Sequence, residues 1–386
     1  RSSDLKNPEL YKTRFGKATK ASTPFSIDFK KTNSRLSLNL GSGILSGQYA
    51  YELMKKMTLA IPSDCNFDTL PIPFRAVSVN LTSGNVEVFT QGDIAEAIRA
   101  SMSIPAFFKP FEIDGQYYID GGTRNNTPID VAVKMGYDII IVSEISSTLV
   151  EDYETFKSNP LEALKQMTNL EQAVRNRDIY KKASLVMFPD YANCTILDFS
   201  KSEEIYKSSK QSVQQYRSEF AKIKKEIEEK TVSLSSAEQN RFTCYESSYK
   251  ENQMPYVTSV SVIGGNEQDK FLVERAFSAI KNTQLNAKSY TSFEKAIYKS
   301  GRYENVLTRI TKTNSRDSNI EVILSKKENT NLKISLGAEY KGTLTTNAMN
   351  DFTMQTQIRK ENFLGKGSIL AFGGSFLTDY LFSLNY

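Results

Sequence analysis

A predicted β-hairpin at residues 111–120 is the feature that most constrains this chain. Apolar and aromatic runs at 111–113 and 117–119 flank Asp114-Gly115. Asp-Gly between two such runs predicts a tight turn that joins antiparallel strands. The second strand ends on a carboxylate, Asp120. The sequence therefore predicts two paired strands that present an acid at a strand tip.

Asp120 is followed by Gly121 and Gly122. Glycine takes positive φ freely and leaves room at its α-carbon, so we expect this pair to let backbone or a ligand approach the carboxylate. The acid then has two interpretations. It accepts hydrogen bonds from its own turn, as many Asp residues before glycine do, or it is a catalytic base. Spacing alone favours the turn interpretation.

A short helix and a strand are predicted after this turn. Thr127 has the character of an N-cap, with Pro128 at the first helical position. Gly136 is expected to end the helix. Residues 137–145 (YDIIIVSEI) predict a buried strand.

Residues 101–138 resemble the second active-site motif of patatin-like phospholipases, in which Asp-Gly-Gly or Asp-Gly-Ala supplies the partner of a serine nucleophile. Three further runs resemble the same family in the same order: GILSGQ at 43–48, PIPFRAVSVNLTSGNVEVFTQGD at 71–93 and ASMSIPAFFKP at 100–110. The resemblance covers residues 34–190. It implies an α/β hydrolase domain of three layers with a mostly parallel sheet. It also implies that Asp120 is the general base and that Gly121 and Gly122 support its motif.

The resemblance implies Ser-Asp chemistry. The chain has no histidine, which excludes Ser-His-Asp and Cys-His catalysis within it. In a Ser-Asp dyad the aspartate takes the serine proton as the hydroxyl attacks an ester carbonyl. Because an ordinary Asp has a pKa of about 3.9, we expect Asp120 to be partly desolvated, which strengthens it as a base. Apolar and aromatic neighbours are expected either to desolvate Asp120 or to be ordinary core residues: Phe107, Phe108, Tyr118 and Ile119.

The nucleophile itself is missing from the sequence. The family's serine lies in a Gly-x-Ser-x-Gly elbow after a glycine-rich oxyanion loop, and neither occurs here. The chain begins with Arg1. We therefore expect an internal piece of a longer protein, inactive alone, whose serine precedes Arg1. Two other pairs of serines are poor candidates. Ser42 and Ser46 in GSGILSG lack the elbow spacing, and Ser101 and Ser103 are expected to end a helix.

The cysteine content and the net charge limit which cofactors and binding partners we expect. The three cysteines, Cys65, Cys194 and Cys244, are far apart and form neither a disulfide framework nor a metal cluster. We expect no metal and no organic cofactor. Lysine and arginine number 49 against 44 acidic residues, a net charge of +5 spread along the chain. Such a mild excess suits anionic lipid headgroups but does not make a nucleic-acid groove. The expected partners are a phospholipid substrate and membrane lipid, without nucleic acid.

Residues 201–230 predict an amphipathic helix. Its apolar positions follow three- and four-residue steps: Ile205, Val213, Tyr216, Phe220, Ile223 and Ile227. Packing against its own domain is favoured over a membrane surface, because acids and bases are mixed on the polar face. A domain boundary is expected within residues 231–251.

A small α+β domain is predicted next. The order is strand, helix, helix, strand, strand, at residues 256–265, 268–281, 292–300, 303–311 and 320–325. This unit resembles a polypeptide-transport-associated (POTRA) domain, including the turn at Gly264 and the Ser-Gly-Arg-Tyr step at 300–303.

The C-terminal residues predict antiparallel strands. Residues 332–341 alternate apolar and polar side chains, and 351–360, 368–376 and 380–386 continue as candidate strands. The length suits an outer-membrane strand, although a soluble antiparallel sheet shows the same alternation. NFLGKG at 362–367 resembles a turn near the start of barrels in the POTRA-containing outer-membrane family. Because four strands cannot close a barrel of at least about eight, we expect more strands beyond the chain.

Together these features predict three modules: a patatin-like phospholipase domain at 1–250, a POTRA-like domain at 251–328 and the start of an outer-membrane β-barrel at 329–386. The order is similar to type V autotransporters of the patatin kind. The expected function is phospholipase A-type hydrolysis of glycerophospholipid acyl esters at the outer membrane or cell surface of a Gram-negative-type bacterium, or after release by cleavage. Barrel-assembly machinery is an expected partner, and the oligomeric state is left open. Two alternatives stay open: a translocation or assembly protein with a degenerate hydrolase domain as a binding module, and a soluble lipase with an appended β domain.

Overall fold

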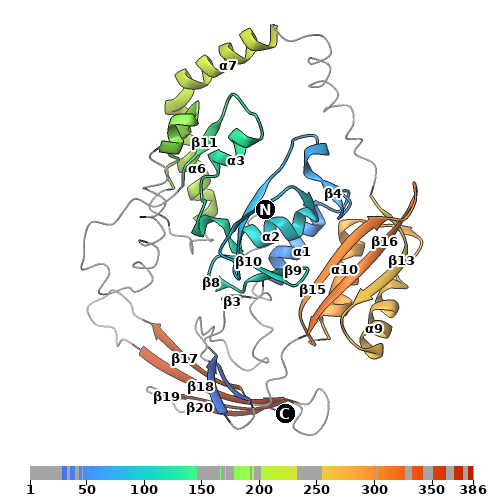
Figure 1. The fold of residues 1–386 in the computed structure, drawn as a ribbon. Coiled ribbons are helices and arrows are strands. Elements are labelled where there is room, and N and C mark those ends of the chain that lie inside the picture. Colours follow the sequence, from blue (N-terminus) through green and yellow to red (C-terminus); the bar gives the residue numbers. More distant parts are fainter. Residues whose placement is uncertain are drawn as a thin grey trace. The chain divides into compact units, whose positions relative to one another are not determined.

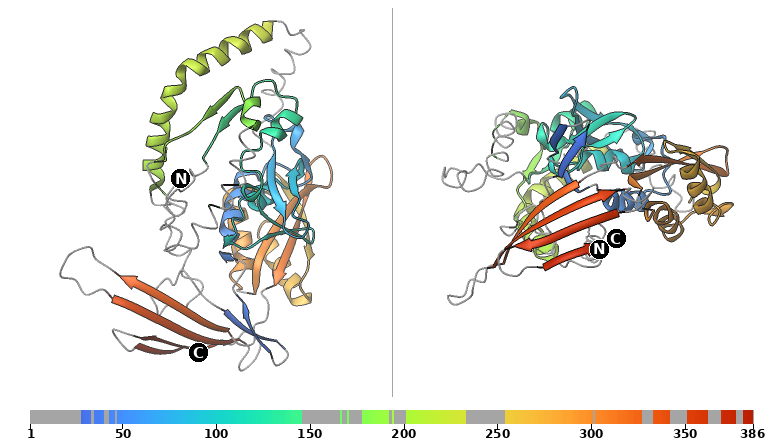
Figure 2. Two further views of the ribbon diagram at one scale, coloured as in Figure 1. Left: turned by 60° about the vertical axis from the view of Figure 1, so that its left-hand side comes forward. Right: turned by 90° about the horizontal axis from the view of Figure 1, so that it is seen from below.

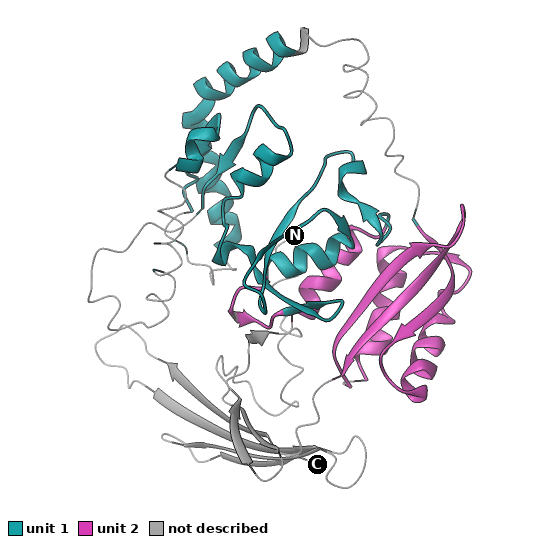
Figure 3. Cartoon of the chain, viewed as in Figure 1, with its two compact units in different colours: residues 1–6, 60–102, 111–254 teal, residues 7–59, 103–110, 255–386 magenta. Residues whose placement is uncertain are grey.

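The computed structural model describes residues 28–32, 35–39, 43–45, 47–145, 166, 170, 178–191, 194, 201–232, 254–300, 302–326, 333–341, 351–361, 369–376 and 381–385. The chain divides into two compact units, each built from segments that are separate in the sequence (Figure 3). Unit 1 comprises residues 1–6, 60–102 and 111–254, and unit 2 comprises residues 7–59, 103–110 and 255–386.

The main sheet of unit 1 has four strands in the order β6-β5-β10-β9. Their bounds are Ala76–Asn80 for β5, Val86–Phe89 for β6, Phe111–Ile113 for β9 and Gln116–Asp120 for β10. The predicted hairpin is confirmed: β9 and β10 are joined by Asp114 and Gly115, whose φ angles of 50° and 78° are typical of a type I′ turn.

This sheet differs from the mostly parallel sheet expected from the family resemblance. Every neighbouring pair in it is antiparallel. Short turns join β5 to β6 and β9 to β10, and such turns favour antiparallel pairing, since a parallel pair requires a long crossover. A parallel pair does occur elsewhere in unit 1, between β11 (Ile141–Ser143) and β12 (Leu185–Met187). Two short strands, β4 (Cys65–Asn66) and β7 (Gln91–Gly92), pair antiparallel.

Helix α2 (Ile94–Ser101) packs against β5 and β10. It begins where the Asp93 side chain accepts a hydrogen bond from the Glu96 amide at 3.1 Å, the usual way to satisfy a free amide at a helix start. Three small side chains of this helix are almost fully buried, and they allow it to lie close to the sheet. They are Ala95, Ala97 and Ala100.

The segment after Asp120 differs from expectation at its start. Helix α3 (Ile129–Lys134) follows Pro128 without a side-chain cap. Thr127, the expected cap, instead donates its hydroxyl hydrogen to the buried Glu144 side chain at 2.6 Å, and no side chain caps the helix. Gly136 follows the helix with a φ of 80°, as predicted. The strand predicted at 137–145 is confirmed only as the short β11.

Residues 202–232 are helical, as predicted, in three consecutive parts (Figure 1). Helix α6 (Ser202–Ser212) leads through a 3₁₀ turn at Val213–Tyr216 into α7 (Arg217–Val232). Among the apolar positions of the predicted stripe, Ile223 is buried and Ile227 is 47% exposed. The predicted packing of the whole stripe is therefore realised only in part.

Unit 2 contains the α+β module with the predicted elements in order and one short strand that was not predicted, β14, between the two helices (Figure 1). Its sheet has the order β14-β13-β16-β15, in which β13 and β16 are parallel and the other pairs antiparallel. The elements are β13 (Tyr256–Ile263), α9 (Glu267–Phe277), β14 (Thr283–Gln284), α10 (Ala287–Tyr298), β15 (Tyr303–Lys312) and β16 (Asp317–Lys326). Both helices and three of these strands contribute to one hydrophobic core, which includes Val257, Val273, Phe277, Phe293, Ile297, Val306 and Val322.

Helix α1 (Gln48–Met57) belongs to this unit and contacts α10 and β15. Unit 2 also holds β1 (Asp28–Thr32) paired with β2 (Arg35–Asn39), and β3 (Gly43–Leu45) paired in parallel with β8 (Ala106–Phe108).

The predicted C-terminal strands form a four-stranded antiparallel meander (Figure 2). They are β17 (Lys333–Lys341), β18 (Asp351–Glu361), β19 (Ile369–Phe376) and β20 (Leu381–Asn385). The NFLGKG turn at 362–367 lies outside the described residues. The module boundaries at 250 and 328 stay predictions. Within the described part of the chain, no helix combines the length and the apolar character that crossing a bilayer requires.

Candidate active site

Asp120 is the last residue of β10, at the end of the strand away from the Asp114-Gly115 turn. Strand β10 is paired on both sides, with β9 and with β5. In the ladder with β5, Asp120 lies directly opposite Ser78, so both side chains project from the same face of the sheet. At Asp120 itself the pairing is with β5 alone, because the pairing with β9 covers residues 116–118.

The turn after Asp120 is a 3₁₀ turn at Gly121–Thr123 that the acid itself caps. Its Oδ1 atom accepts a hydrogen bond from the Gly122 amide at 2.6 Å, and the Thr123 hydroxyl donates to the Asp120 carbonyl at 2.8 Å. Asp120 therefore does accept a hydrogen bond from its own turn, as the structural interpretation predicted. This bond engages one oxygen of the carboxyl group.

The two glycines are required by space and not by backbone torsion. A Cβ atom on Gly121 would lie 2.2 Å from the carbonyl oxygen of Val77. One on Gly122 would lie 2.7 Å from Oδ1 of Asn126 and 2.9 Å from Oδ1 of Asp120. The close approach of backbone that we expected is confirmed. Neither glycine uses the positive φ that glycine permits.

The electrostatic environment suits a base. Burial raises the pKa of Asp120 above its ordinary value, and the hydrogen bond from Gly122 opposes that shift without cancelling it. Among the described residues, the bond from Gly122 is the one hydrogen bond to this carboxyl group, and no lysine or arginine forms an ion pair with it. The second oxygen, Oδ2, has no hydrogen-bond donor within the described part of the chain.

The surroundings of Asp120 match the sequence expectation in part. Tyr118 projects from the same face of β10, is 9% exposed and packs its ring against Phe89 at 5.2 Å between centroids. Ile119 alternates to the opposite face. Phe107 and Phe108 belong to unit 2.

Nearby polar side chains were not singled out by the sequence. Ser78 is fully buried, and its hydroxyl has no hydrogen-bond partner within the described segments. Arg99, also fully buried, places its guanidinium 5.3 Å from the centre of the Phe111 ring, and burial lowers its pKa to about 10. Both residues sit in regular elements, where a lone polar residue gives little signal. Pairing in the sheet is what brings Ser78 to Asp120.

Of the serines weighed as nucleophiles, the structure describes Ser101 and Ser103. Ser101 is the last residue of α2, near its predicted place at a helix end, and its hydroxyl donates to the Val77 carbonyl at 2.7 Å. Ser103 belongs to unit 2. Ser42 and Ser46 lie outside the described residues. No hydroxyl of the described residues donates to the Asp120 carboxylate.

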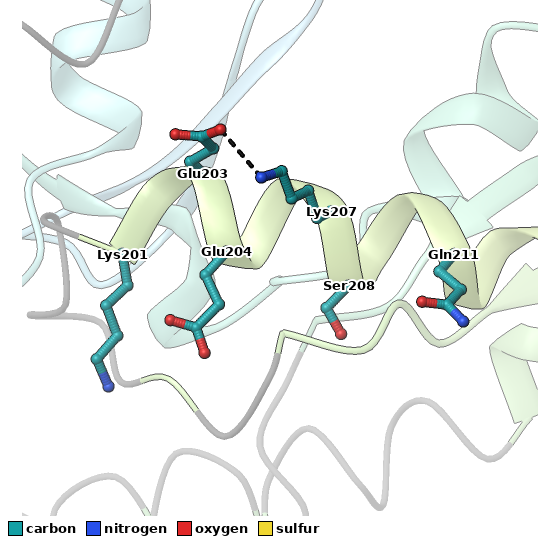
Figure 4. A pocket seen from close by; sticks show the side chains of 6 residues that line it. All are labelled: Lys201, Glu203, Glu204, Lys207, Ser208 and Gln211. Atoms are coloured by element: carbon teal, nitrogen blue, oxygen red, sulfur yellow. Dashed lines mark ion pairs between the residues drawn. The ribbon is translucent and has the colours of Figure 1, made fainter.

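Two hollows lie elsewhere and lack the features of a catalytic site. One, of about 580 Å³, runs along α6 (Figure 4) and is lined by Lys201, Glu203, Glu204, Lys207, Ser208 and Gln211. Its side chains come from one helix, and Glu203 pairs with Lys207 at 3.1 Å. The other, of about 480 Å³, is an apolar groove between α9 and α10. Across the residues that the structure describes, no three His, Cys, Asp or Glu side chains gather as metal ligands.

The region around Asp120 is similar to a known protein family. Residues 5–133, which include Asp120, match the model of the patatin-like phospholipase family. The chain is 26% identical over 167 residues to mouse patatin-like phospholipase domain-containing protein 7, covering 37% of this chain and 12% of that protein. It is 33% identical over 81 residues to an uncharacterized NTE family protein of Mycobacterium tuberculosis, covering 21% of this chain and 22% of that protein.

The chain therefore spans only a small part of the curated relatives it matches, 12% of the first. Among solved structures, it is similar to BamA from Haemophilus ducreyi lacking POTRA domains 1-3, with 18% identity and a TM-score of 0.21. That likeness covers 34% of this chain and 23% of BamA, and a score so low does not establish a shared fold.

Proposed function

We propose that this chain supplies the base of a lipolytic Ser-Asp dyad, with Asp120 as the proton acceptor. The observation that carries the proposal is the state of its carboxyl group. Oδ1 is fixed by the Gly122 amide, Oδ2 has no partner among the described residues, and burial raises the pKa. The match of residues 5–133 to patatin-like phospholipases supports the same assignment. A carboxylate arranged in this way is oriented and more basic than an exposed one.

The proposed reaction is hydrolysis of a glycerophospholipid acyl ester through an acyl-enzyme. The serine comes from sequence outside residues 1–386, in the longer protein. Its Oγ attacks the acyl carbonyl carbon while Asp120 takes the hydroxyl proton. The tetrahedral intermediate then expels the glycerol oxygen, to which Asp120 returns the proton. Water next attacks the acyl-enzyme, gives its proton to Asp120 and releases the fatty acid, and the proton passes back to the serine.

Backbone crowding explains the roles of the glycines in this proposal. Gly121 lets the turn press against the Val77 carbonyl, and Gly122 keeps its amide within reach of Oδ1. Together they fix the angle at which the carboxyl group leaves β10. Neither glycine takes part in proton transfer.

The cellular setting is a separate part of the proposal. The strand-helix-helix-strand-strand module and the antiparallel strands β17–β20 are arranged as expected for a POTRA-like domain followed by the beginning of an outer-membrane β-barrel. We place the hydrolase at the outer membrane or surface of a Gram-negative-type bacterium, either anchored there or released by cleavage. Barrel-assembly machinery is then a partner, and membrane phospholipid is the substrate.

The test uses the full-length protein that contains this chain. A fluorophosphonate probe should label one serine, outside residues 1–386, and phosphatidylcholine vesicles should release fatty acid. Absence of both labelling and release would favour the degenerate binding module. Labelling and release by a protein that stays in the aqueous fraction after membrane extraction would support the hydrolase and reject the membrane setting.

A further inference from the structure

The outer edge of β15 in the α+β module is covered by side chains of α1. On its other side β15 pairs with β16, which leaves the backbone groups of alternate residues facing outward. Gln48 accepts a hydrogen bond from the Val306 amide at 3.0 Å and donates to the Val306 carbonyl at 2.8 Å. One turn along the helix, the Tyr51 hydroxyl accepts from the Thr308 amide at 2.9 Å and donates to its carbonyl at 3.0 Å. Two side chains of α1 thus reproduce the bonds of a neighbouring strand.

The side chains that form this contact are buried from solvent. Gln48 is 2% exposed and Tyr51 is fully buried. The hydroxyl of Tyr290 on α10 lies 2.9 Å from the hydroxyl of Thr308, so the Thr308 side chain is hydrogen-bonded within the module. Because a buried backbone amide without a partner is costly, α1 and the edge of β15 depend on one another.

A pair of buried carboxyl groups lies beside this contact. Glu52, one helical turn after Gln48, and Glu294 on α10 are 4% and 1% exposed and hydrogen-bond to one another. Gln48 also donates to Oε1 of Glu294 at 2.7 Å. Burial first, and then the charge of Glu52, raise the pKa of Glu294 to about 8. Two carboxyl groups in bonding contact cannot both be ionised cheaply.

We propose that Glu52 and Glu294 share one proton while α1 is docked, and that loss of this proton to solvent releases α1 from the edge of β15. In the docked state the shared proton forms the hydrogen bond between the two carboxyl groups. After its loss two negative charges face each other in a buried site. Undocking hydrates both, and it exposes the amides and carbonyls of Val306 and Thr308.

The lysines near Glu52 and Glu294 do not replace the shared proton. Lys56 on α1 lies 3.5 Å from Glu52, and its side chain is 29% exposed. Lys295 on α10 favours the charged form of Glu294, but its effect is the smallest of those acting on that group. Lys55, which is 1% exposed, is also on the buried side of α1. The strand β15 contributes backbone groups at Val306 and Thr308.

The sign of the pH effect follows from the raised pKa of Glu294. Docking is strongest below the ordinary Glu value of 4.5 and weakens as the pH rises toward about 8. Across that window each pH unit lowers the docking equilibrium constant by up to about tenfold. Salt screens such a buried pair weakly, so the effect should persist at physiological ionic strength.

Hydrogen–deuterium exchange read by mass spectrometry tests this inference on the whole chain. Protection factors, corrected for the intrinsic effect of pH, are compared at pH 5.5 and pH 8.5. We expect peptides covering Val306 and Thr308 to lose at least tenfold in protection at pH 8.5. Peptides from β13, an interior strand of the same sheet, should stay protected and so exclude general unfolding.

Glu294→Gln is the matched variant, because glutamine keeps an acceptor for Gln48 and offers a donor to Glu52 without titrating. Its protection at Val306 and Thr308 should be equal at both pH values. If Glu294→Gln does not fold, Glu52→Gln serves the same purpose from the other side of the pair. Equal protection of the native chain at both pH values, or an equal loss in the native chain and in the folded glutamine variant, would overturn the proposal.

Discussion

The Oδ1 atom of Asp120 accepts a hydrogen bond of 2.6 Å from the amide of Gly122. This bond is local, and it occupies one of the two oxygens of the carboxyl group. In the proposed dyad the other oxygen, Oδ2, takes the proton. The two interpretations of Asp120 are compatible, since each uses a different oxygen.

The pH dependence of ester hydrolysis should report the raised pKa of Asp120. A base must be ionised, so kcat/KM of the full-length protein should fall as the pH drops through this pKa. The acid limb is expected above the ordinary Asp value of 3.8, because burial disfavours the charge. Asp114→Asn, a change in the hairpin turn, should leave the limb where it is. An acid limb at or below 3.8 would contradict the proposed environment.

Gly121→Ala should distort the turn that carries Asp120. The new methyl group would lie 2.2 Å from the Val77 carbonyl oxygen, so backbone must move. We expect destabilisation of about 1 to 3 kcal/mol, as for other overpacked sites, with loss of hydrolysis. Gly115→Ala is the control. It has open space around the added carbon but a φ of 78°, at a cost of about 1 kcal/mol. Thermal unfolding that ranks the two variants equally would refute the steric explanation.

Asp269 should stabilise the α+β module through its charge. Burial alone would raise its pKa, but hydrogen bonds from the Asn266 amide, Lys326 and Tyr303 outweigh burial and lower the pKa to about 2. The stabilisation is present above pH 3.8 and is lost as the pH falls toward 2. Asp269→Asn should cost about 2 to 3 kcal/mol near pH 7.

The measurement for Asp269 is thermal unfolding of the whole chain at pH 7 and pH 2. The difference between native chain and variant should shrink at the lower pH. Glu267→Gln is a control at the same helix end, because the side chain of Glu267 is 87% exposed and its pair with Lys270 is solvated. A variant difference of the same size at both pH values would count against a charge effect.

Tyr51→Phe should weaken the contact of α1 with β15. It removes the hydroxyl that bonds both backbone groups of Thr308, and we expect a cost of about 1 to 3 kcal/mol. Tyr49→Phe, on the exposed side of α1 at 36% exposure, should change stability little. Amide exchange at Thr308 measures both effects, and unchanged exchange in Tyr51→Phe would show that the hydroxyl does not hold the edge.

Local sequence patterns predicted the elements well. The Asp114-Gly115 turn and the strands of the α+β module follow from turn chemistry and alternation, which act over a few residues. The position of Asp120 at the end of β10 follows from the same rules.

Features that depend on distant pairing were not accessible from the sequence. The placement of Ser78 opposite Asp120 requires the β5–β10 register, and the bonds of Gln48 join residues 258 positions apart. Thr127 had the residue type of a cap, but its hydroxyl donates to Glu144, 17 positions away, and no side chain caps the helix. The sheet of unit 1 is antiparallel and not mostly parallel, as the resemblance implied, because short turns join β5 to β6 and β9 to β10.

The most direct test of the account is the hydrolysis of phosphatidylcholine by the full-length protein carrying Asp120→Asn. Asparagine keeps the volume and can still accept the Gly122 bond, but it cannot take a proton. We expect kcat/KM to fall by about 10² to 10⁴-fold, with unchanged thermal unfolding and with Asp114→Asn fully active. Turnover within twofold of the native rate, in a folded Asp120→Asn protein, would contradict the assignment of Asp120 as the base.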